Sequence, residues 1–140
     1  KKYVTDFANP KVVGAEGTIV TPHLGASTKE SEDNCAVMAV KEIRDFLENG
    51  NVKNSVNFPN CDMGVCTGAG RVTICHKNIP GMLGAFTTVM GNAGVNISDM
   101  TNKGKGDYAY TMMDLESEAT KEIVKALEAV DGVLRVRIIK

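Results

Sequence analysis

The sequence predicts an α+β protein made of two unequal parts. Residues 71–140 show a β-α-β-β-α-β order of hydrophobic patterns, whereas residues 1–58 show only two short strands and one long helix. Between them, residues 59–70 contain three glycines and almost no charge, a composition typical of a linker. We therefore expect one small complete domain preceded by an incomplete α/β segment.

Composition excludes several classes of protein. The 140 residues are 43% hydrophobic and 24% charged, with a net charge of -1, which is ordinary for a folded chain. This balanced charge and the absence of Trp argue against a nucleic-acid surface. No apolar run approaches the ~18 residues of a membrane span, and no secretory signal pattern is present. We expect a cytoplasmic protein without nucleic-acid or membrane partners.

The cysteines do not predict a metal site. No Cys-x-x-Cys pair occurs, and only His23 and His76 could assist as ligands. The four thiols are expected to be reduced and mostly buried as packing residues: Cys35, Cys61, Cys66 and Cys75.

The first part begins with two candidate strands, Tyr3–Asp6 and Thr18–Thr21, the second of which Pro22 ends. A helix follows, for which the stretch from Ser27 to Glu30 fits a capping box. Its apolar residues recur at helical spacing, and Gly50 is suited to a left-handed C-cap: Ala36, Ala39/Val40, Ile43 and Phe46/Leu47. Two strands and one helix cannot bury a sheet on both faces, so the part resembles the closing segment of a larger α/β domain.

The second part contains every element of a small domain. Strands are expected at 71–76, 95–100, 108–115 and 133–139, helices at 82–93 and 118–130, and a turn at 103–107. This order is the ferredoxin-like βαββαβ arrangement, in which helices cover one sheet face. The other face, which carries Thr73 and Cys75, needs a partner or solvent-tolerant side chains, and we expect a dimer through strand edges or helices.

One loop of this domain is a candidate ligand site. His76-Lys77-Asn78-Ile79-Pro80-Gly81 joins the first strand to the first helix. Pro80 suits the first helical turn, Gly81 allows close approach of a ligand, and the free N–H groups of Met82 and Leu83 could receive a carboxylate. Asn78 adds both a donor and an acceptor, as an amino acid requires. The alternative is an ordinary turn, with His76 a half-buried strand-end residue.

This loop, together with Gly94-Val95-Asn96-Ile97, resembles the ACT domain, a small-molecule regulatory module of amino-acid metabolism. The resemblance is to the serine-binding version of that domain. It implies that His76, Asn78 and Asn96 surround L-serine or another small amino acid at the interface of two domains, and that the chain is a homodimer under allosteric control.

The first part resembles the D-2-hydroxyacid dehydrogenases. Tyr3–Phe7, Thr21–Thr28 and Asn54–Pro59 carry the similarity, in particular to the members that oxidise 3-phosphoglycerate to 3-phosphohydroxypyruvate at the start of serine synthesis. The resemblance implies that His23 is the general acid/base of the complete NAD-dependent enzyme and that Asp6 lies near the nicotinamide.

The chain lacks the phosphate-binding turn of those enzymes. No Gly-x-Gly-x-x-Gly occurs, and Gly68-Ala69-Gly70 precedes a strand where a helix would be required. We therefore expect a C-terminal fragment that is inactive alone and binds no NAD, with residues 1–58 from the catalytic region, 59–70 a linker and 71–140 the ACT regulatory domain. Two alternatives stay open: an ACT domain that serves only for dimerisation, and a free-standing amino-acid sensor.

Overall fold

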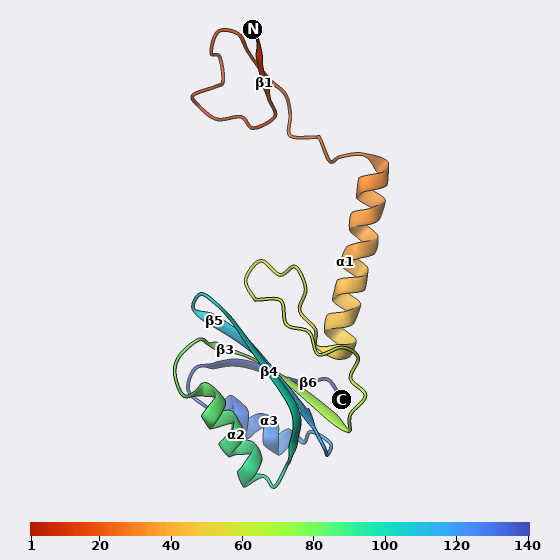
Figure 1. Cartoon of the computed structure of the whole chain (residues 1–140), viewed down its shortest axis with the longest axis vertical. Helices are drawn as coiled ribbons and strands as arrows, with labels where there is room; N and C mark the ends of the chain where they lie inside the picture. Colours follow the sequence, from red (N-terminus) through yellow and green to blue (C-terminus); the bar gives the residue numbers. More distant parts are fainter. The chain divides into compact units, whose positions relative to one another are not determined.

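The computed structural model describes residues 1–140, which form two compact units, Lys1–Val40 and Lys41–Lys140. The long helix α1 (Lys29–Asn49) begins in the first unit and ends in the second. Figure 1 shows the elements of both.

The first unit contains a minimal parallel sheet. Strands β1 (Tyr3–Thr5) and β2 (Thr18–Val20) pair with Tyr3 opposite Thr18. Both predicted strands are confirmed, but they bury almost nothing: Tyr3, Val4 and Phe7 are all largely exposed. A two-stranded sheet has too little apolar area to form a core, as expected for an incomplete α/β segment.

The N-terminus of α1 differs from the predicted capping box. Thr28, and not Ser27, caps the helix, because its Oγ1 accepts from the Ser31 N–H at 3.2 Å. The C-terminal prediction is confirmed. Gly50 follows the helix with a φ of 78° and donates its N–H to the Phe46 carbonyl at 3.0 Å.

The second unit is a four-stranded antiparallel sheet in the order β4-β5-β3-β6. Its elements are β3 (Gly70–Lys77), α2 (Met82–Asn92), β4 (Ile97–Lys105), β5 (Tyr108–Leu115), α3 (Lys121–Glu128) and β6 (Val133–Ile138). The chain order and sheet order together confirm the ferredoxin-like βαββαβ fold.

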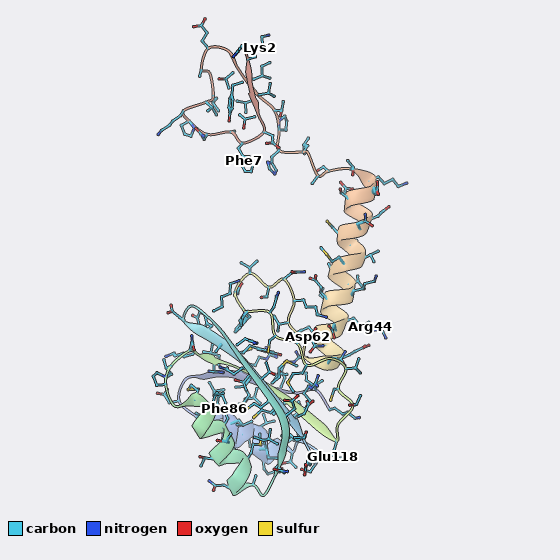
Figure 2. All side chains as sticks on the ribbon, in the orientation of Figure 1. Lys2, Phe7, Arg44, Asp62, Phe86 and Glu118 are labelled. Carbon is cyan, nitrogen blue, oxygen red and sulfur yellow. The ribbon has the colours of Figure 1, made fainter.

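Helices α2 and α3 cover one face of this sheet (Figure 1). The main core lies between these two helices and the sheet, and it includes Phe86 of α2 (Figure 2), which has no exposed surface. Alternate residues of the two central strands point into it, as period-two patterning requires: Val72, Ile74, Met113 and Leu115.

Residues of the chain itself pack on the opposite face, for which the sequence predicted a partner or solvent-tolerant side chains. Val52 and Cys61 form an isolated antiparallel bridge and pack with Tyr110 and Met112 in a second apolar cluster. Tyr110 donates its hydroxyl to the Gly50 carbonyl at 2.8 Å, which joins this face to the end of α1. Cys61 is 2% exposed.

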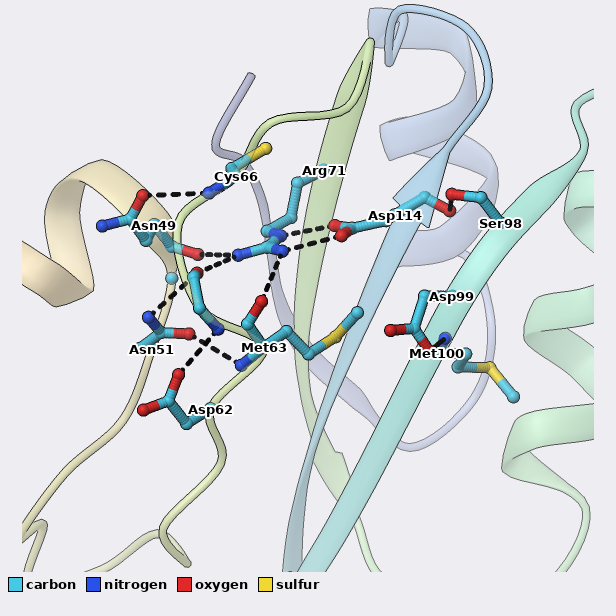
Figure 3. Close-up of polar contacts among 12 residues, drawn as sticks. Asn49, Asn51, Asp62, Met63, Cys66, Arg71, Ser98, Asp99, Met100 and Asp114 are labelled. Atoms are coloured by element: carbon cyan, nitrogen blue, oxygen red, sulfur yellow. Dashed lines mark hydrogen bonds and ion pairs between the residues drawn. The ribbon is translucent and has the colours of Figure 1, made fainter.

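Residues 59–70 therefore make contacts that a free linker would not. The buried guanidinium of Arg71 donates to the carbonyls of Met63 and Gly64 and to that of Asn49 at the end of α1, and it pairs with Asp114 (Figure 3). The compact unit accordingly extends back to Lys41. The division into 1–58, 59–70 and 71–140 stays a prediction about the domain limits.

Two element boundaries differ from the sequence prediction by three residues or more, the start of α3 and the end of β4. α3 begins at Lys121, three residues later than expected, because the Thr120 hydroxyl accepts from the Ile123 N–H at 3.4 Å and caps the helix. The turn between β4 and β5 is shorter than 103–107: Lys105 pairs with Tyr108, leaving Gly106 and Asp107 as a two-residue hairpin turn.

None of the helices combines the length and the apolar character that crossing a membrane requires.

Candidate functional site

His76 lies at the end of β3, but its ring is inside the protein. The residue is 2% exposed, and its ring packs edge-on against Phe86 with centroids 5.0 Å apart. Nδ1 lies 2.8 Å from the Lys77 carbonyl oxygen and Nε2 lies 2.9 Å from Thr111 Oγ1. Both ring nitrogens thus have partners within the chain.

Asn78 is exposed and bound to the β4–β5 hairpin. Its main-chain N–H donates to the Asp107 carbonyl at 2.9 Å, and its Nδ2 donates to the Gly106 carbonyl at 3.1 Å. A Cβ at Gly104 would lie 2.9 Å from Asn78 Nδ2, so a side chain there would displace the Asn78 amide from this position. The amide oxygen Oδ1 remains free to accept.

The N-terminus of α2 follows this loop. Gly81 has a φ of 88° and no side chain caps the helix, whose first turn also contains no acidic residue. Pro80 precedes the helix and does not lie in its first turn, because α2 begins at Met82. The N–H groups of Met82 and Leu83 precede the first intrahelical bond, which Ala85 donates to Gly81.

Asn96 lies far from Asn78 within one chain. It is exposed and immediately precedes β4, where its carbonyl accepts from the Glu116 N–H at 3.1 Å. Asn78 contacts the other end of β4, at Gly104, and eight residues of strand separate the two ends by about 26 Å. A single chain does not bring the two asparagines together.

Sequence reasoning missed two polar residues beside His76. Thr111 of β5 is fully buried, and its Oγ1 donates to Asn102 Oδ1 of β4 at 2.9 Å. The same Oδ1 lies 3.3 Å from His76 Nε2. The two-residue turn Gly106–Asp107 sets the register that places Asn102 opposite Thr111, so a correct hairpin prediction would have found this pair.

In the first unit, the structure brings Asp6 and His23 together. Asp6 Oδ2 lies 3.4 Å from His23 Nδ1, and the Phe7 ring packs edge-on against the imidazole at 4.5 Å between centroids. The arrangement orients a histidine by a carboxylate, as proton transfer at Nε2 would need, and both side chains are exposed.

Neither a Gly-x-Gly-x-x-Gly turn into a helix nor a cluster of metal-ligating side chains occurs in the structure. Gly70 opens β3, so Gly68-Ala69-Gly70 forms no turn into a helix that could hold a pyrophosphate. No group of three or more His, Cys, Asp or Glu side chains could hold a metal ion. All four cysteines are free, and burial raises the pKa of the Cys61 thiol to about 11.

Comparison with known proteins gives one consistent result. D-3-phosphoglycerate dehydrogenase of Escherichia coli strain K12 is 27% identical over 126 residues, and the same enzyme of Dictyostelium discoideum is 30% identical over 122 residues. D-3-phosphoglycerate dehydrogenase 1 of Saccharomyces cerevisiae is 26% identical over 136 residues. This chain is homologous to the C-terminal part of D-3-phosphoglycerate dehydrogenase.

The similarity to D-3-phosphoglycerate dehydrogenase covers 89% of this chain and 30% of the Escherichia coli enzyme, so it extends over both compact units. In Dictyostelium discoideum and Saccharomyces cerevisiae the matched part is 30% and 29% of the relative. The chain thus spans about 30% of the length of the curated relatives it matches. No protein-family model matches it.

Solved structures were also compared. The ACT domain from GTP pyrophosphokinase of Chlorobium tepidum aligns with 49% of this chain and 94% of its own, at 19% identity and a TM-score of 0.44. The regulatory subunit of aspartate kinase from Thermus thermophilus aligns with 50% of each chain, at 13% identity and a TM-score of 0.40.

Proposed function

We propose that this chain is the C-terminal regulatory part of an NAD-dependent D-3-phosphoglycerate dehydrogenase and that residues 71–140, an ACT domain, bind L-serine as feedback effector. The observation that carries the proposal is the homology over 89% of the chain, which includes the loop from His76 to Gly81. The complete enzyme would oxidise 3-phosphoglycerate to 3-phosphohydroxypyruvate in the cytoplasm.

The loop has the chemistry that a small zwitterion requires. The uncapped N-terminus of α2 offers the N–H groups of Met82 and Leu83 to a carboxylate. Asn78 Oδ1, left free by the bond from Nδ2 to Gly106, can accept from an ammonium group. The N–H groups for the carboxylate and the oxygen for the ammonium group thus lie close together, in the first turn of α2 and in the loop that precedes it.

The site would be completed by a second copy of the chain. β4 is an edge strand with no partner on its outer side. Antiparallel pairing of two β4 edges would place the start of one strand beside the end of the other. Asn96 of the second copy would then lie near Asn78, although the two are far apart within one chain.

The first unit would contribute to catalysis in the complete enzyme. His23 would exchange a proton with the substrate hydroxyl as hydride moves to NAD, and Asp6 would orient its ring near the nicotinamide. The pyrophosphate of NAD would be held by another part of the enzyme, since this chain has no turn for it. We expect the chain alone to show no dehydrogenase activity.

One observation favours a second candidate function. Both ring nitrogens of His76 are occupied within the chain, so this residue is as compatible with a purely structural role as with ligand binding. An ACT domain that only joins two chains would dimerise through β4 and respond to no amino acid.

Thermal unfolding and calorimetry with L-serine separate the two candidates. A ligand that binds only the native state stabilises it by about 2.7 kcal/mol at a hundred times its dissociation constant. We expect L-serine to raise the melting temperature by several degrees and D-serine to have no effect. Asn78→Ala should weaken the response while its unliganded melting temperature is kept. A firm dimer without any response to L-serine would overturn the proposal in favour of a dimerisation module.

A further inference from the structure

We propose that Asn102 determines specificity at this effector site by recognising the side-chain hydroxyl of the amino acid, and that Thr111 and His76 position its amide. The inference rests on the proposed function and deepens it. Neither Asn102 nor Thr111 lies in the loop motif, and hydrogen bonds of the structure connect them to it.

A chain of hydrogen bonds leads from the core to the surface. His76 and Thr111 are buried, whereas Asn102 is exposed on the edge strand β4. The Thr111 hydroxyl lies 2.9 Å from both His76 Nε2 and Asn102 Oδ1. The exposed amide is therefore held by two buried groups and does not rotate freely as a surface asparagine would.

Asn102 lies beside the predicted ligand. The Asn78 amide lies against Gly104, 2.9 Å from the position that a Cβ would take there. Asn102 is two residues before Gly104, on the same face of β4. Two residues of strand correspond to about 7 Å, a separation that leaves room for one small molecule hydrogen-bonded to both amides.

The donors and acceptors of the site divide the ligand between them. The N-terminus of α2 suits the carboxylate, and Asn78 Oδ1 suits the ammonium group. One end of the Asn102 amide faces Thr111 and His76, which leaves its other end free for a ligand. A side-chain hydroxyl, which L-serine has and L-alanine lacks, can both donate and accept, so it can pair with that free end.

This assignment gives His76 a role that fits its burial. A ring that is 2% exposed, with both nitrogens in hydrogen bonds, does not contact a ligand in this conformation. It supports the Thr111 hydroxyl and, through it, the orientation of the Asn102 amide. His76 is thus a positioning residue.

Calorimetric titration of the whole chain with L-serine and L-alanine tests the proposal. Asn102→Ala should weaken L-serine binding by about 3- to 10-fold, the worth of one hydrogen bond, and leave L-alanine binding unchanged. Thr111→Val should reduce the same selectivity and Thr111→Ser should restore it. Asn92→Ala, which removes an exposed asparagine at the end of α2, is the matched control.

The outcomes are distinct. Equal weakening of both ligands by Asn102→Ala would show a merely structural role and overturn the inference, as would unchanged L-serine binding. Failure of the unmodified chain to bind L-serine would overturn the proposed function itself and this inference with it. The melting temperature of each unliganded variant shows whether Thr111→Val folds, and Asn102→Ala tests the proposal independently of it.

Discussion

Arg71 is a buried residue that connects several segments of the second unit by hydrogen bonds. Its side chain is 1% exposed, and all of its nitrogens donate: to both carboxylate oxygens of Asp114 and to the carbonyls of Asn49, Met63 and Gly64 (Figure 3). The hydrogen bond to Asp114 raises the pKa of Arg71, so the guanidinium remains charged. One side chain thereby holds the end of α1 and the following loop to the central strands.

We predict that Arg71→Ala destabilises the chain by about 3–5 kcal/mol, because it leaves three carbonyls and a carboxylate without their donor. Arg71→Met, which keeps apolar volume, should also destabilise but by less. Urea unfolding followed by circular dichroism measures both. Arg135→Ala, at an exposed position on β6, should change stability by less than about 0.5 kcal/mol. Equal stability of Arg71→Ala and the unmodified chain would contradict this account.

At the scale of elements, hydrophobic periodicity was sufficient for the second unit. All four strands and both helices of the βαββαβ order were predicted, because each has a side that the core requires to be apolar. The boundaries that failed, at Thr120 and at the β4–β5 turn, depend on single side-chain caps and on strand register, which periodicity does not report.

The covering of the second sheet face could not be predicted in this way. Residues 51–64 have the composition of a loop, and what places them on the sheet is the bond pattern of Arg71 and the bridge between Val52 and Cys61. For the site, the motif named His76 and Asn78, but the burial of His76 and its connection to Asn102 follow from strand pairing. A local sequence pattern does not report which strands and loops pair when they are far apart in the sequence.

Gly50, directly after α1, allows a test of how closely the end of this helix packs on the sheet. A Cβ there would lie 2.6 Å from Thr73 Cγ2, and the φ of 78° is itself unfavourable for other residues. We predict that Gly50→Ala destabilises by clearly more than the 1–2 kcal/mol that left-handed backbone costs alone. Gly94→Ala is the matched control, since Gly94 has a φ of 68° and open space around its Cβ position. Equal melting temperatures of the two variants would show that the contact with Thr73 is unimportant.

At the scale of the whole molecule, the second apolar cluster predicts sensitivity to alkali. Burial raises the pKa of Cys61 from 9.0 to about 11 and that of Tyr110 from 10.0 to about 12. A group whose pKa is raised by folding contributes its full stability below its unfolded pKa and loses that contribution as pH rises. The free energy of unfolding should therefore fall from about pH 9 to pH 12.

Urea midpoints measured at intervals of pH check this expectation. Tyr110→Phe removes one of the two groups, so its stability should fall less steeply between pH 10 and pH 12, even though the variant also loses the hydrogen bond to Gly50. An identical slope in the two proteins would exclude Tyr110 as a source of the alkaline instability.

The proposed effector site makes a prediction that only a two-chain arrangement can satisfy. If Asn78 of one chain and Asn96 of a second copy form each site, a dimer of two Asn78→Ala chains has no intact site, and neither has a dimer of two Asn96→Ala chains. Mixing the two variants gives a dimer in which one site has lost both asparagines and the other keeps both. Calorimetry of the mixture after subunit exchange should recover L-serine binding with close to the original affinity, at one site per mixed dimer. A site formed within one chain would be damaged in every subunit of the mixture, and no tight binding would return. The 26 Å of β4 that separates the two asparagines, about the length of eight strand residues, is the reason to expect recovery.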